Sequence, residues 1–171
     1  PDLTNWNTHK VTSMLNMFHG AESCLCEQTT TWNTVSAETM ENMFQDAAVA
    51  NPNVQSWNVA TVTHMQNMFK NAAAAGLEGD QTTQWDVRKV LTFEETFHNA
   101  GVANPDVSLW NTQSATTMRQ MFKDAIKAEA TCSASTWNTI ALLDATDMFY
   151  MAGKANPDLT NWNTHKVTSM L

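Results

Sequence analysis

A fixed frame of apolar positions recurs along the chain, and each copy begins at a tryptophan. The tryptophans that define repeats 1 to 7 are Trp6, Trp32, Trp57, Trp85, Trp110, Trp137 and Trp162. Counted from the tryptophan, positions +8, +11, +12 and +15 are mostly apolar, as in Met65, Met68, Phe69 and Ala72 of repeat 3. This spacing is typical of one face of a helix. The pattern therefore predicts a short helix in the second half of each repeat, with the residue at +7 as its N-cap.

The first half of each repeat has a different pattern. Position +2 is always Thr or Val, and position +1 is always Asn or Asp. Because successive side chains of a strand point to opposite faces, this predicts a short strand with +2 inward and +1 outward. The outward column is a candidate exposed ladder, formed by Asn7, Asn33, Asn58, Asp86, Asn111, Asn138 and Asn163. These side chains could contact a partner or a sugar, or they could hydrogen-bond to one another along the stack.

A strand, a turn and a helix every 25 to 28 residues predict an α/β solenoid, with parallel strands on one side and helices on the other. Its interior is expected to be filled by the recurrent Trp, Met and Phe. Residues 1–171 would form a single uncapped solenoid of six complete rungs and the start of a seventh. Two loop types alternate, as in EQTTTW before Trp32 and ANPNVQSW before Trp57. The alternation predicts loops that let neighbouring rungs interlock.

Residues 1–15 and 157–171 have the same sequence, PDLTNWNTHKVTSML. One explanation is that residues 1–156 are one unit of a longer tandem array and that 157–171 begin the next unit. A deliberate overlap is the competing explanation. A stack without capping repeats exposes apolar ends, which favours a chain that continues.

The frame L-x-x-W-[ND]-[TV]-x-x-V-T-x-M-x-x-M-F-x-x-A runs through the whole chain. It resembles the BspA-like bacterial surface repeat, which has a similar length and is also seen in mycoplasma lipoproteins. The resemblance implies a leucine-rich-repeat-type solenoid, displayed outside the cell and often linked to adhesion. It supplies no catalytic residues to carry over. Phe93, Thr96 and Ala145 depart from the pattern, as does the alternation of loops.

Composition and motifs narrow the function classes. A net charge of -8, with scattered lysines and arginines, argues against binding nucleic acid by phosphate neutralisation. No run of about 18 apolar residues is present, so no membrane span is expected in this segment. The histidines lack metal-ligand spacing, and no phosphate-binding loop or nucleophile elbow occurs. We therefore expect no catalytic residue, no cofactor and no metal, and a protein that is not an enzyme.

The three cysteines cannot all be paired within one chain. Cys24 and Cys26 could form a local disulfide or bind a soft metal, and Cys132 lies in an equivalent loop near the other end. If cysteines cross-link separate molecules, Cys24, Cys26 and Cys132 are all candidate residues for that bond. Inert loop cysteines are the remaining interpretation.

Two function hypotheses follow. In the first, the chain is a segment of a long extracellular solenoid that forms a fibre, appendage or surface layer, with copies of itself as partners in tandem, end to end or side by side. In the second, it is a surface adhesin that recognises a host protein or glycan through its sheet face or loops. The uniform +1 column favours a scaffold, whereas position +3 varies. Thr and Asn columns also suggest ice binding, but the Thr column is predicted to face inward.

Overall fold

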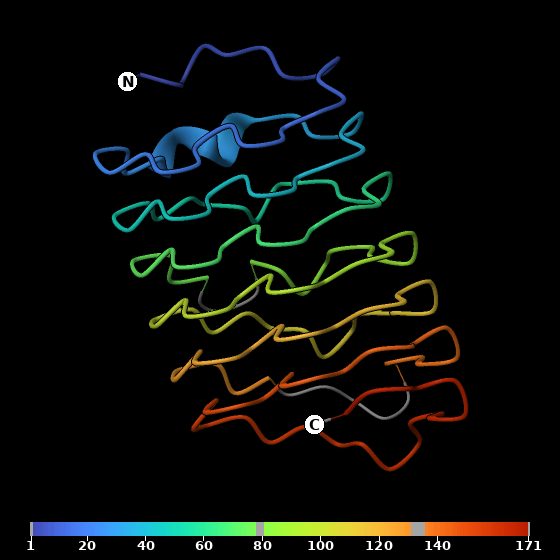
Figure 1. Cartoon of the computed structure of the whole chain (residues 1–171). Helices are drawn as coiled ribbons and strands as arrows, with labels where there is room; N and C mark the ends of the chain where they lie inside the picture. The colour runs from blue at the N-terminus through green and yellow to red at the C-terminus, as the bar shows by residue number, and fades with distance from the viewer. Residues whose placement is uncertain (1, 78–80, 131–135, 171) are drawn as a thin grey trace.

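The computed structural model describes residues 2–77, 81–130 and 136–170. The chain runs in irregular coils stacked one on the next, and its two ends lie at opposite ends of the stack (Figure 1). Within the described ranges, the only helix is the 3-10 helix η1 (Glu27–Thr31). Neighbouring repeats pair there through isolated parallel bridges rather than strands, always at position +7. These bridges are Ser13–Thr39, Thr39–His64, His64–Thr92, Thr92–Thr117, Thr117–Asp144 and Asp144–Ser169.

The predicted α/β solenoid, with a strand and a helix in each rung, is therefore wrong, and so is the leucine-rich-repeat-like architecture. Where the helix was predicted, the backbone folds into consecutive turns. In repeat 3, the N–H of Met68 donates to the C=O of Met65 at 3.2 Å, and the N–H of Ala72 donates to the C=O of Phe69 at 3.0 Å. These bonds span three residues, whereas an α-helix requires bonds that span four.

Left-handed backbone at two positions of each repeat explains the difference. Residues at +10 and +14 have φ between 52° and 65° in all six complete repeats. They are Asn16, Asn42, Asn67, Glu95, Gln120 and Asp147 at +10, and Gly20, Asp46, Asn71, Asn99, Asp124 and Met151 at +14. A positive φ at the third residue of a turn is the mark of a type II turn, for which Gly and Asn are preferred. A right-handed helix cannot pass through such residues.

Because no helix uses them, the backbone N–H groups of these residues donate to the next repeat instead. Donors at +8, +10, +12 and +14 meet carbonyls at +7, +9, +11 and +13 of the following repeat. In repeat 3, Asn67 donates to Glu94 and Phe69 donates to Thr96, both at 2.9 Å. Every second residue therefore joins two coils, while the residues between close the local turns, so the buried backbone is satisfied without a regular sheet.

The core consists of aromatic columns that run along the stack. Trp32 and Trp57 lie with ring centroids 6.2 Å apart and planes within 4°, and Phe44 and Phe69 lie 5.5 Å apart and within 5°. The indole N–H of Trp57 donates to the C=O of Thr29 at 3.0 Å, so the ring has a polar partner although it is buried. Methionines at +8 and +11 fill the space beside the rings, and those of repeats 2, 3 and 5 are fully buried. The predicted Trp, Met and Phe core is confirmed.

Positions +2 and +5 also face inward as predicted in repeats 2 to 6. The two loop types differ in their contacts, because an asparagine that opens the Asn-Pro loops bonds to other loops. Asn104 donates its backbone N–H to the C=O of Gly76 at 3.0 Å, and its side-chain Oδ1 accepts the N–H of Glu129 at 2.9 Å. Asn51 joins Leu25 and Gly76 in the same way, at 2.8 and 3.0 Å. Asn51 and Asn104 therefore each form hydrogen bonds to the loop of the repeat before and the loop of the repeat after.

Candidate functional site

The predicted exposed ladder at +1 lies at the surface. Asn7, Asn33, Asn58, Asn138 and Asn163 are exposed, and Asp86 and Asn111 are half-buried. Each side chain accepts the N–H two residues further along, as Asn58 does from Ala60 at 3.0 Å. This is an Asx turn, in which the side chain fixes the local backbone. Among the described residues, no hydrogen bond joins one member of the column to the next.

The column varies in charge at one place. In repeat 4, Asp86 accepts hydrogen bonds from the Arg88 guanidinium at 2.8 and 2.6 Å. The guanidinium, through these bonds, holds the pKa of Asp86 below its usual range. Asp86 therefore stays ionised and keeps the turn, and repeat 4 has an ion pair of no net charge where the other repeats have a neutral amide.

A ladder of amides along the stack does exist, but at positions +10 and +14. Asn42 donates from Nδ2 to Oδ1 of Asn16, and Asn67 donates to Asn42, both at 2.9 Å. Asn71 donates to Asp46 at 2.7 Å in the neighbouring column. Sequence reasoning missed this ladder because it placed these residues on a helix. The recurrence of Asn, Asp and Gly at two fixed positions is the signal that could have revealed left-handed turns.

The same face carries ion pairs in repeats 3 to 6. Glu95 accepts hydrogen bonds from Lys70 and, at 2.8 Å, from His98. Burial acts to raise the pKa of Glu95, but these two bonds outweigh it, and the pKa lies below its usual value. Lys123 likewise bonds to Asp147 at 2.9 Å, which together with Gln120 lowers the pKa of Asp147.

These carboxyl groups are ionised at neutral pH and already occupied by cations on the neighbouring repeat. The ion pairs Lys70–Glu95 and Lys123–Asp147 each join two neighbouring repeats. No group of three His, Cys, Asp or Glu side chains in the described ranges is placed to hold a metal ion. In the same ranges, the structure contains no helix with the length and apolar character that a bilayer crossing requires.

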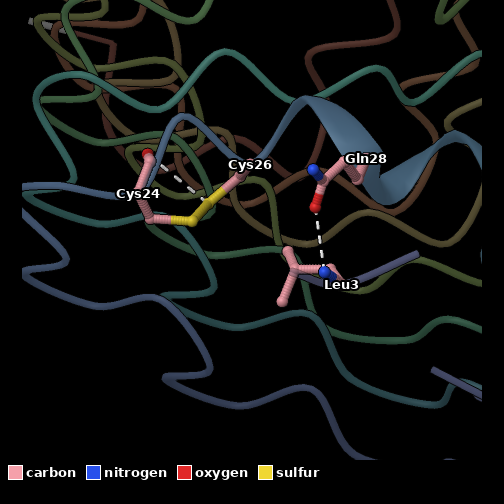
Figure 2. Close-up of a disulfide and its surroundings, with 4 residues drawn as sticks. All are labelled: Leu3, Cys24, Cys26 and Gln28. Atoms are coloured by element: carbon pink, nitrogen blue, oxygen red, sulfur yellow. Dashed lines mark hydrogen bonds between the residues drawn. A yellow bond between two sulfur atoms is a disulfide. The ribbon is translucent and has the colours of Figure 1, made fainter. Parts of the chain in front are cut away.

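Cys24 and Cys26 form a disulfide with each other, with Cα atoms 5.2 Å apart (Figure 2). Both are buried, and Cys26 directly precedes η1. Figure 2 also shows Gln28 of η1, whose Oε1 accepts the backbone N–H of Leu3 at 2.9 Å. Of the predicted alternatives, the structure thus contains the local disulfide for this pair. Cys132, the third candidate, lies outside the described residues.

An apolar hollow of about 280 Å³ opens at the C-terminal end of the stack. Met148, Phe149 and Trp162 line it, together with Leu159 and Met170. The side chains at these positions are core residues in interior repeats.

The comparisons with known proteins agree with the repeat frame. No curated protein and no solved structure matches the chain. Residues 1–78 and 73–171 each match one protein family, and the two matches together cover all seven tryptophan-led repeats. The chain therefore belongs to the family described as "Mycoplasma protein of unknown function, DUF285" and is a repeat-containing protein of that family.

Proposed function

We propose that this chain is a non-enzymatic structural protein of BspA-like type, and that it is a segment of a fibre, appendage or surface layer outside the cell. Its partners are copies of the same unit, joined in tandem, end to end or side by side. The family membership supports a repeat protein, and the ion pairs Lys70–Glu95 and Lys123–Asp147 support a role for this face in joining one repeat to the next.

The observation that carries the proposal is that the same phenylalanine and backbone contacts recur between successive repeats. The phenylalanine column crosses all five intervals between repeats 1 and 6 with centroid distances of 5.3 to 5.8 Å. The backbone bonds recur as well: Phe44 to Met68 and Phe122 to Met148 both measure 2.9 Å. Because the phenylalanine stack and these backbone bonds recur in every interval from repeat 1 to repeat 6, a further unit can be added through the same contacts. That property is what a long assembly needs.

Electron microscopy of the native material, with gold-labelled antibodies raised against the purified chain, tests the proposal. We expect the label to follow filaments or a continuous layer outside the cells, and to disappear when the antibody is first absorbed with the purified chain. Label confined to isolated short particles, or to the cell interior, would contradict a structural role outside the cell.

A surface adhesin is the second candidate, and the varied residues at +3 favour it. Val35 and Ile140 are 45% and 52% exposed at this position, where repeat 4 carries Arg88. Exposed apolar side chains beside a rigid turn suit the recognition of a host protein or glycan. Binding of the purified chain to immobilised glycans and host-cell proteins tests it. Val35→Ser with Ile140→Ser should abolish binding, and the control Val49→Ser, in a loop and 38% exposed, should leave it unchanged.

A further inference from the structure

Three departures from the repeat frame lie together on the surface of repeats 4 and 5. Position +1 carries a carboxylate only at Asp86, position +3 carries a guanidinium only at Arg88, and position −1 carries a large apolar side chain only at Leu109. The turns do not require these residues, because Asn58 forms the same Asx turn in repeat 3 and position −1 is a neutral polar residue in every other repeat. Side chains that a repeated scaffold does not need are the ones that can carry recognition.

Two hollows, both open to solvent, meet at the pair formed by Asp86 and Arg88. The first has a volume of about 250 Å³, and Leu109 and Asn111 line it together with the pair. The second has a volume of about 260 Å³, and Gln113 lines it together with the same pair. Leu109 is 58% exposed, so the first hollow has an apolar wall that faces water. Each hollow therefore combines charged groups with amides, and one of them adds an apolar surface.

The guanidinium of Arg88 is held in a fixed direction and keeps a free edge. Asp86 accepts hydrogen bonds from Nε at 2.8 Å and from Nη2 at 2.6 Å, while the backbone C=O of Arg88 accepts the hydroxyl of Ser114 at 2.7 Å. A guanidinium has five N–H donors. Both N–H groups of Nη1 and the second one of Nη2 have no acceptor among the described residues. These donors form a second fork, which matches the two oxygens of a carboxylate.

The groups around the fork indicate what else the ligand carries. Lys89 is exposed, and with Arg88 it makes the only pair of adjacent basic residues in a chain of net charge -8. The Oδ1 atom of Asn111 accepts the N–H of Gln113 at 3.1 Å, which leaves the Asn111 NH₂ group as a donor. Donors of this kind suit hydroxyl groups, and Leu109 suits a face of C–H groups. An acidic peptide offers the carboxylate without a neighbouring row of hydroxyls, so a sugar fits the whole set better.

We propose that this surface binds a sugar that carries a carboxylate, such as a hexuronic acid. The carboxylate accepts two N–H groups from the free fork of Arg88, the hydroxyls accept from Asn111, and one face of the ring packs on Leu109. Asp86 is a positioning residue, because it directs the guanidinium. The inference rests on the surface adhesin, the second candidate function above, and names its ligand class and a contact site.

Binding of three small probes to the full chain tests the ligand class. Side-chain and backbone N–H signals of the ¹⁵N-labelled chain would be followed by NMR during titration with sodium glucuronate, glucose and sodium acetate. We expect glucuronate to bind about tenfold or more tightly than either of the others, with shifts at Arg88 Nε and at the Asn111 amide. Equal binding of glucose would overturn the role of the carboxylate, and equal binding of acetate would overturn the role of the ring. Tighter binding of a hexaglutamate peptide would overturn the choice of a sugar.

Substitutions test the named contacts in the same titration. Arg88→Lys keeps the positive charge but loses the planar fork, so it should weaken glucuronate binding about tenfold or more. The control Arg119→Lys changes an arginine that bonds to Glu94 at 2.9 Å outside both hollows, and it should leave binding unchanged. Leu109→Ser should weaken the binding of glucuronate but not of acetate. Circular dichroism establishes that each variant is folded, and equal binding by Arg88→Lys and the unchanged chain would overturn the site.

A second pair of measurements separates this site from the adhesin proposal. Val35→Ser with Ile140→Ser changes position +3 two repeats before and two repeats after Arg88, so glucuronate binding should be unchanged. If host proteins bind the chain but glucuronate does not, the sugar site is overturned and the adhesin stands. If glucuronate binds and Arg88→Lys abolishes it, while no host protein or glycan is bound, the sugar site stands and the adhesin is contradicted.

Discussion

Gly20→Ala gives a sharp test of the turns that replace the predicted helix. Gly20 is at +14 of repeat 1 and has φ +65°, and a Cβ built on it meets no heavy atom within 4 Å. The substitution therefore changes the backbone preference without a steric clash. Gly101 and Gly153 also have open space around an added Cβ, and their φ values lie outside the left-handed region, so they are matched controls.

The expected magnitudes follow from two opposing effects. Alanine in the left-handed region costs about 1–2 kcal/mol. Alanine also restricts the unfolded chain relative to glycine, which stabilises the fold by about 0.4–1 kcal/mol. Gly20→Ala should thus lower the unfolding free energy by about 1 kcal/mol, whereas Gly101→Ala should raise it by about 0.4–1 kcal/mol. The contribution of the unfolded chain cancels between the two, so their difference measures the cost of the left-handed backbone directly.

Urea unfolding followed by tryptophan fluorescence measures both changes, provided that the slopes agree. Amide exchange at position 20, whose N–H donates to Gln45 at 2.8 Å, reports the same change locally if the end repeat opens by itself. In a helix, replacing glycine with alanine at this position would instead stabilise by about 0.5–1 kcal/mol. If Gly20→Ala stabilises as Gly101→Ala does, the argument for a left-handed turn is refuted.

Three further predictions concern the core, a buried hydroxyl and the charged face. Phe69→Ala should lower the unfolding free energy in urea by about 3–5 kcal/mol, because the ring is fully buried between two others at 5.5 and 5.8 Å. The control Leu109→Ala, at an exposed side chain, should lower it by less than about 0.5 kcal/mol. Equal losses would contradict the stacked core. Thr34→Val should lower the unfolding free energy by about 1–3 kcal/mol in the same assay, because the Thr34 hydroxyl donates to the C=O of Asn58 at 2.9 Å and accepts the N–H of Asn58 at 2.8 Å. An unchanged midpoint would show that these bonds contribute nothing to stability. The folded-state pKa of Glu95 is below its usual 4.5, so the stability it adds relative to Glu95→Gln should be complete above pH 4.5 and disappear as the pH falls through the folded value. Urea midpoints across that range measure it, and a difference that does not depend on pH would show that the ion pairs do not stabilise the fold.

The sequence determined which side chains face inward. Trp57, Val59, Val62, Met65, Met68 and Phe69 are all buried, as the recurrent frame predicts. The reason is that burial of apolar side chains depends on their identity and spacing, and the repeat sequence specifies both. The outward position of Asn58 and its neighbours in the +1 column was predictable on the same grounds. The alternation of loop sequences likewise indicated the interlocking that Asn51 and Asn104 provide.

The sequence did not determine the backbone path between those side chains. Apolar residues at +8, +11, +12 and +15 face one side in a helix, and they also face one side in two successive turns with left-handed residues at +10 and +14. The choice depends on where the N–H groups find acceptors. For Asn67 the acceptor is the C=O of Glu94, in the next repeat. Only the tertiary structure supplies this acceptor, because a carbonyl 27 residues away becomes a neighbour only when the coils are stacked. The repeat thus specified its core, and the contact with the following repeat decided its backbone conformation.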